Sequence, residues 1–135
     1  VVKTPKCYWA DMGLLRHLSR QRTSLTGELF ETYVVSELVK WFQTAGTPVR
    51  LFYYRTRSGL EADILLETDQ GLIGAEIKAR TRVSASDAGP LRRLAEAAGE
   101  RWLGGLVITD GTRLERLEGK RLWAVGATRL LGSLE

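Results

Sequence analysis

The sequence has little of the chemistry that thiol and histidine sites need. Its 135 residues include one cysteine, Cys7, and one histidine, His17. A single cysteine can form neither an internal disulfide nor a thiolate metal cluster, which fits a reducing compartment. A lone histidine with no partner defines no catalytic group. The sequence therefore excludes histidine-ligated zinc and gives little support to cysteine catalysis.

Long hydrophobic runs are also lacking. No apolar run approaches the roughly 20 residues that a membrane helix needs, and no signal-peptide pattern opens the chain. We therefore expect a cytoplasmic protein without membrane association. The chain starts at Val1, and residues 1–6 have the look of a segment from within a longer protein. We interpret the sequence as an excised domain.

The composition is that of a globular protein with a modest positive charge. Hydrophobic residues make up 44% and charged residues 27%, so we expect residues 1–135 to form one domain. The net charge of +4 allows a polyanion as partner. The arginines that we expect to contact nucleic acid flank the segments that carry acids, although solvated loops would also explain them. They are Arg50, Arg55, Arg57, Arg80 and Arg82.

Hydrophobic spacing predicts a mixed α/β fold. The expected helices cover residues 27–42 and 87–99, and the expected strands cover 49–54, 61–67, 72–78, 102–109 and 122–125. The sequence also predicts a short strand at 7–9, a short helix after Asp11 and capping of the helix at 27–42 by Ser24 or Thr26. Residues 111–119 look like a turn-rich excursion, and the apolar run 102–109 suits a central, buried strand. This order describes a sheet with helices packed on it.

One acid lies inside an apolar helical arc. In the helix expected at 27–42, the residues three, four and seven positions after Glu31 are Val34, Val35 and Leu38. These positions share a helix face. We therefore expect the Glu31 carboxylate to point at the core.

Two further acids interrupt apolar strands that are joined by a turn. If the turn is centred between Asp69 and Gln70, residues whose numbers sum to 139 lie opposite each other, which places Asp63 against Glu76. A bulge at Gly71 could slip this register by one. Facing carboxylates repel, and a bound cation would remove that conflict. An ordinary charged strand face is the alternative.

Lys78 completes the group of predicted catalytic residues. It follows Glu76 by two positions and so shares its strand face, roughly 6–7 Å away. Glu31, Asp63 and Glu76 offer only oxygen ligands, which suit Mg²⁺ or Mn²⁺. Phosphodiester hydrolysis needs hydroxide near neutral pH and a counter-charge, both of which such a cation provides. Lys78 could position or deprotonate the water or stabilise charge, and the sequence does not choose.

At these residues the chain resembles the PD-(D/E)xK nuclease-like superfamily. The matching runs are G-E-L-F-E at 27–31, R-T-R-S-G-L-E-A-D at 55–63 and E-I-K at 76–78. Together with Y-W-A-D-M-G-L-L at 8–15, they are similar to one branch, the domain found C-terminal to AAA-type ATPase modules in bacteria and archaea. The resemblance covers about residues 6–125.

The resemblance implies a restriction-endonuclease-like core with a central mixed sheet flanked by helices. By position it assigns Glu31, Asp63 and Glu76 to the superfamily's acids and Lys78 to its lysine, while Ala62 stands where a proline often precedes the aspartate. It implies a metal-dependent deoxyribonuclease and an N-terminal ATPase module in the same chain. A non-catalytic module that binds nucleic acid or protein, and a homo-oligomerisation domain, remain the competing hypotheses.

Overall fold

The computed structural model describes residues 27–46, 48–55, 57, 59–119 and 121–134. The strand and helix predicted between residues 7 and 20, and the predicted caps Ser24 and Thr26, lie outside this range. The 55–63 run is described in part only.

The described chain combines helices and strands. It begins with helix α2 (Gly27–Ala45), followed by strands β1 (Arg50–Arg55), β2 (Glu61–Glu67) and β3 (Leu72–Lys78). A short 3₁₀ helix, η1 (Ala85–Ala88), leads into α3 (Gly89–Ala98), and a second, η2 (Gly99–Arg101), precedes β4 (Trp102–Thr109). Strands β5 (Leu114–Leu117) and β6 (Leu122–Gly126) and helix α4 (Ala127–Leu134) complete it.

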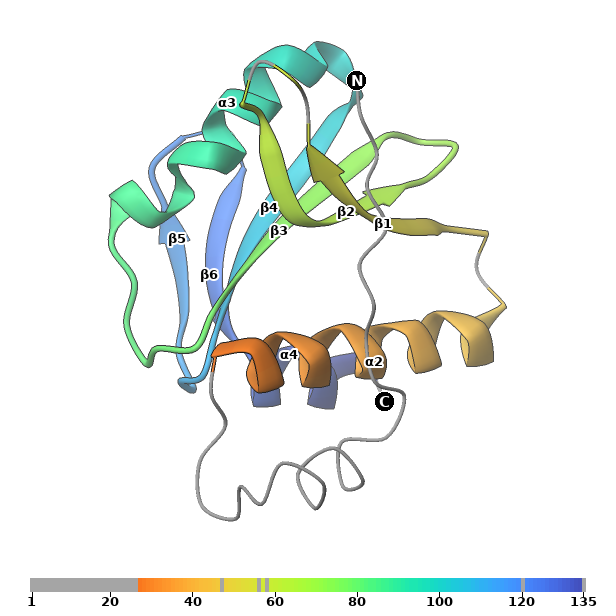
Figure 1. The fold of residues 1–135 in the computed structure, drawn as a ribbon, viewed down its shortest axis with the longest axis vertical. Coiled ribbons are helices and arrows are strands. Elements are labelled where there is room, and N and C mark those ends of the chain that lie inside the picture. The colour runs from red at the N-terminus through yellow and green to blue at the C-terminus, as the bar shows by residue number, and fades with distance from the viewer. Residues whose placement is uncertain (1–26, 47, 56, 58, 120, 135) are drawn as a thin grey trace.

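The six strands form one mixed sheet in the order β1-β2-β3-β4-β6-β5. Neighbouring pairs among β1, β2 and β3 are antiparallel, β3, β4 and β6 run parallel, and β5 returns antiparallel to β6 at the edge. Strand β4 therefore lies inside the sheet, as its apolar sequence predicts. The predicted fold class, an α/β fold with a central mixed sheet flanked by helices, is confirmed (Figure 1).

The two faces of the sheet carry separate cores. Helices α2 and α4 cover one face, where Phe30, Val34, Ile64, Ala75 and Ile77 pack together. Helix α3 covers the other (Figure 1). There Leu65 of β2, Leu91 and Leu94 of α3, Trp102 and Val107 are buried together. Alternation along a strand thus decides which helix a side chain meets.

Local sequence explains where these elements begin and end. Helix α2 stops at Gly46, whose φ of 66° favours glycine. Pro90 lies in the first turn of α3, where a missing N–H costs nothing. The β2–β3 turn is tied by Thr68, whose hydroxyl accepts the N–H groups of Gln70 and Gly71. The strands predicted at 61–67, 72–78 and 102–109 have these bounds in the structure.

Three elements depart from the sequence predictions. Strand β5 lies within the excursion predicted as turns, and residues 127–134 form a helix where none was predicted. The helix predicted at 87–99 is divided, because η1 precedes the regular α3.

In the described range, no helix combines the length and apolar character needed to span a membrane.

Candidate functional site

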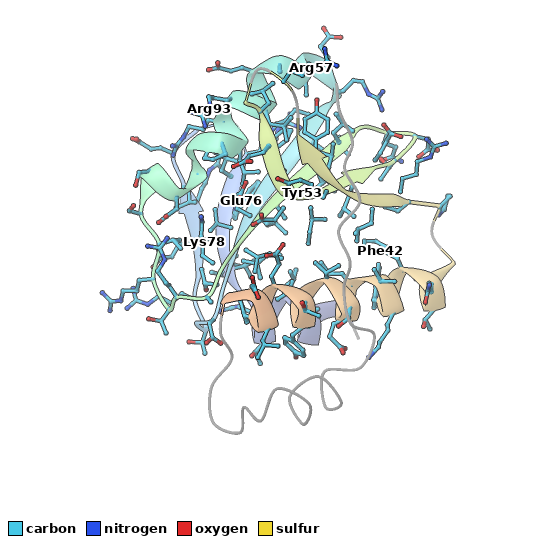
Figure 2. All side chains as sticks on the ribbon, in the orientation of Figure 1. Phe42, Tyr53, Arg57, Glu76, Lys78 and Arg93 are labelled. Carbon is cyan, nitrogen blue, oxygen red and sulfur yellow. The ribbon has the colours of Figure 1, made fainter. Side chains whose placement is uncertain are left out.

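The C-terminal half of β3 turns its polar residues toward α3. A side chain at Gly74 would meet Leu91, Leu94 and Trp102, so this position faces α3. Ala75 and Ile77 belong to the opposite core. By alternation, Glu76 and Lys78 share the α3 face with Gly74. This confirms the face assignment that the sequence predicts, and Figure 2 labels both residues along β3.

The predicted register of the hairpin is confirmed up to the acids. Four residue pairs lie opposite each other, from Glu67 and Leu72 to Ile64 and Ala75, and in each pair the two residue numbers sum to 139. The strand pairing stops there, one step before Asp63 and Glu76, so these two do not form a ladder pair. Between its pairs with Phe52 and Tyr54 of β1, strand β2 also carries one extra residue. Such an irregularity redirects side chains at the point where strands part.

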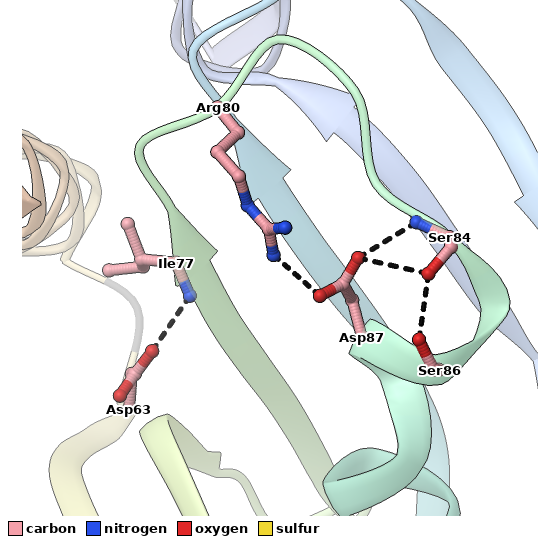
Figure 3. A network of polar contacts seen from close by, with 6 residues as sticks. All are labelled: Asp63, Ile77, Arg80, Ser84, Ser86 and Asp87. Carbon is pink, nitrogen blue, oxygen red and sulfur yellow. Dashed lines mark hydrogen bonds and ion pairs between the residues drawn. The ribbon is translucent and has the colours of Figure 1, made fainter.

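The Asp63 side chain bonds to β3 where the backbone pairing of β2 and β3 ends. Its Oδ2 accepts the backbone N–H of Ile77 at 2.8 Å, in place of a carbonyl of β2 (Figure 3). The carboxylate therefore lies against β3 itself and is half-buried. The sequence places Asp63 near Glu76, and the structure adds that the backbone of β3 holds it there.

Glu76 is the unusual acid of the site. Only 5% of it is exposed, and its Oε1 is buried without a hydrogen-bond partner. Burial, and next the neighbouring Asp63 carboxylate, raise the pKa of Glu76 to about 9, while the Lys78 ammonium acts in the opposite direction. An uncompensated buried carboxylate is costly. A pKa this high favours the protonated form of Glu76 at neutral pH.

The third predicted acid is not assembled with these two. Glu31 lies half-buried in the second turn of α2, beside the fully buried Phe30. Among residues 27–134, apart from the few left undescribed, no three His, Cys, Asp or Glu side chains are grouped so as to hold a metal ion. The donors that fit Mg²⁺ or Mn²⁺ are thus Asp63 and the partnerless oxygen of Glu76. Mg²⁺ often takes one or two carboxylates and completes its shell with waters.

The loop after β3 carries a polar network that the sequence predictions do not include. Asp87 of η1 accepts the Ser84 N–H at 2.8 Å and forms an ion pair with Arg80 (Figure 3). The Ser84 N–H foremost, and also the Arg80 guanidinium, hold the pKa of Asp87 below its usual range. A serine three residues before an acid is the capping-box signature. That spacing could have revealed Asp87 in the sequence.

The predicted nucleic-acid contacts divide into two groups. Arg80 and Arg82 are exposed in the loop after Lys78. Arg57 is exposed in the β1–β2 loop and lies apart from Lys78 in Figure 2. The side chain of Arg55 lies outside the described residues.

Arg50 belongs to the opposite end of the hairpin. It pairs with Glu67 at 3.5 Å, beside a shallow hollow that the β2–β3 turn and Arg101 also line. Arg50 lies opposite Glu67, near the β2–β3 turn. Asp63 and Glu76 lie at the other end of the hairpin, past the pair formed by Ile64 and Ala75. Arg50 is therefore not brought together with the acidic site.

Comparison with known families identifies the chain. It belongs to the family described as a domain of unknown function, DUF4143, whose model matches residues 26–130. The match includes all the predicted site residues, from Glu31 to Arg82, and also Asp87. A comparison with curated proteins gave no significant match.

Proposed function

We propose that this member of the DUF4143 family is a metal-dependent nuclease that hydrolyses DNA phosphodiester bonds. The observation that carries the proposal is the partnerless, buried Oε1 of Glu76 beside Asp63. Two carboxylates so placed offer a cation what Mg²⁺ and Mn²⁺ prefer, oxygen ligands and negative charge.

The residues of the site would divide the work. Asp63 and Glu76 would hold the cation, and Glu31 of α2, which the described structure does not group with them, is the predicted third ligand. The cation would supply counter-charge for the attacked phosphate and lower the pKa of water. Lys78, one step along the same face, would orient the water or stabilise the charge that develops on the phosphate.

The resemblance of residues 27–31, 55–63 and 76–78 to the PD-(D/E)xK superfamily supports the same reaction class. We further propose that an N-terminal AAA-type ATPase module in the same chain is the working partner. The exposed Arg80 and Arg82 next to Lys78 favour a polyanionic substrate.

Two measurements test the nuclease proposal. Isothermal calorimetry with Mg²⁺ or Mn²⁺ should show binding to the wild type and a loss of binding in Asp63→Ala. Plasmid, linear and branched DNA should then be cut with the same metals by the wild type but not by Lys78→Ala. Metal binding without cleavage of any of these substrates would contradict nuclease activity.

A non-catalytic binding module is the second candidate. The observation that favours it is that Glu31 is not grouped with Asp63 and Glu76 in the described structure. In that case DNA or a protein partner would bind equally well to the wild type and to Asp63→Ala. For DNA, the affinity would fall steeply with salt.

A further inference from the structure

The chain reverses direction directly after Lys78 and brings Arg80 back toward the site. The Arg80 N–H donates to the carbonyl of Lys78 at 2.7 Å, which closes a tight turn at the end of β3. Figure 3 shows the Arg80 side chain lying along β3, between the strand and Asp87. The backbone of Asp110 fixes the same turn by donating to the Arg80 carbonyl at 2.9 Å.

Asp87 is rigidly held where it meets Arg80. One of its carboxylate oxygens, Oδ2, accepts the Ser84 N–H at 2.8 Å, and the other accepts the Arg80 guanidinium. Ala88, the next residue, is fully buried against the α3 face of the sheet. The acid therefore lies on the face that Glu76 and Lys78 share, and it is built into the start of η1.

The two partners differ greatly in exposure. The Arg80 side chain is 56% exposed and that of Asp87 only 15%. Exposed ion pairs of this kind contribute little to stability. A guanidinium has five donors, and the ion pair engages Nη2. The pair is thus better suited to aiming the guanidinium than to holding the fold together.

We propose that Asp87 is a positioning residue that holds Arg80 beside Lys78 so that its free N–H groups bind a backbone phosphate of the nucleic acid, next to the one that is cut. This inference rests on the proposed function and names a contact within it. The planar guanidinium suits the geometry of a phosphate, and an ordered side chain loses less entropy on binding.

The sign of one charge change separates positioning from simple electrostatics. Asp87→Asn removes a negative charge, so electrostatics alone predicts tighter binding of a polyanion. Positioning predicts the reverse, a fall in affinity of about two- to tenfold as Arg80 loses its fixed orientation. The asparagine oxygen can still accept the Ser84 N–H, so η1 should keep its cap.

The experiment measures fluorescence anisotropy of a labelled DNA duplex without divalent metal, over a series of salt concentrations. Arg80→Ala should reduce the salt slope by about one phosphate contact, and Asp87→Asn should have no effect in the Arg80→Ala background. Glu96→Gln, an exposed acid on α3, is the matched control and should bind DNA as the wild type does or slightly more tightly. Arg80→Lys keeps the positive charge but lacks the planar guanidinium, so it should weaken DNA binding about as much as Asp87→Asn.

Each outcome decides between the two proposals. If Asp87→Asn binds DNA as tightly as the wild type, or more tightly, the positioning role is overturned. If the wild type cuts DNA and Lys78→Ala does not, the proposed function still stands after that result. If the wild type neither binds nor cuts DNA, both proposals fail together.

Discussion

The two ends of the β2–β3 hairpin use the same residue types in opposite ways. At the turn end, Glu67 lies beside the exposed Arg50, and Asp69 is exposed in the turn. At the open end, Asp63 is tied to the Ile77 N–H and Glu76 is 5% exposed.

Strand geometry explains the contrast. At the turn, the backbone groups satisfy one another, and the side chains are left to solvent. Where the ladder stops after Ile64 and Ala75, Asp63 completes the bonding of β3, and this places a second carboxylate beside Glu76. The comparison teaches that burial and partners, rather than residue type, give an acid unusual chemistry.

The largest expected difference between the two ends is in activity. Lys78→Ala should lower DNA cleavage by about 100-fold or more, since it removes the ammonium that shares a strand face with Glu76 and acts on its charge. Arg50→Ala, at the turn end, should leave the cleavage rate within about twofold. Initial rates of plasmid nicking with Mg²⁺ or Mn²⁺ measure both. Equal losses of cleavage rate in Lys78→Ala and Arg50→Ala would contradict the functional difference between the two ends of the hairpin.

The next effect is a pH dependence of stability that only Glu76 should produce. Its pKa is about 9 in the folded protein against 4.5 as the ordinary value. The folded state therefore binds the extra proton, and stability falls as pH rises from about 4.5 to about 9. Urea unfolding without divalent metal should show a loss on the order of 5 kcal/mol between about pH 5 and about pH 9.

Two glutamine variants check that assignment. Glu76→Gln should flatten the pH profile and raise stability at the alkaline end, because the amide never ionises. Glu67→Gln at the turn end should follow the wild-type profile. A wild-type profile that stays flat would contradict the raised pKa.

A smaller effect concerns the Ile77 N–H. Asp63→Ala leaves this donor without its acceptor and should cost about 1–3 kcal/mol of unfolding free energy. Asp63→Asn keeps an acceptor oxygen and should cost clearly less. Denaturant unfolding should be measured near about pH 6, where Glu76 stays protonated. At that pH, removing Asp63 does not also remove a repulsion between two carboxylates. Asp69→Ala is the control at the turn end and should cost little. If it costs as much as Asp63→Ala, the structural role of Asp63 is contradicted.

The smallest effect is expected for the exposed pair at the turn end. Arg50→Ala should change the unfolding free energy by less than about 0.5 kcal/mol, because both partners keep contact with water. Thermal or urea unfolding measures it. A loss above about 1 kcal/mol would show that the turn end is more than a solvated surface.

The fold was largely accessible from the sequence, since its strong elements bury apolar faces of regular period. The strand 102–109 and the hairpin strands were predicted at their observed bounds. Strand β5 was missed because three of its four residues are exposed, so no alternation marks it. Helix α4 follows β6 without an intervening turn residue, so nothing in the sequence marked its start.

The site was predicted less completely, for physical reasons. The arithmetic that set Asp63 near Glu76 assumed a regular ladder, whereas an extra residue in β2 and the end of pairing changed how they meet. Glu76 lies on the sheet face that α3 covers, and strand periodicity does not reveal how deeply a residue on that face is buried. The described structure does not group Glu31 with the other acids so as to hold a metal ion, and its role as a ligand stays a prediction.

The Ile77 amide has a consequence for how this protein can be studied. It donates to a carboxylate rather than to a peptide carbonyl, so its proton resonance and its exchange with solvent should follow the charge on Asp63. A cation, a proton or a substitution at that acid would each shift the signal of a residue that is itself chemically inert. The strand thus carries its own spectroscopic probe of the site, which can be read before any substrate is identified.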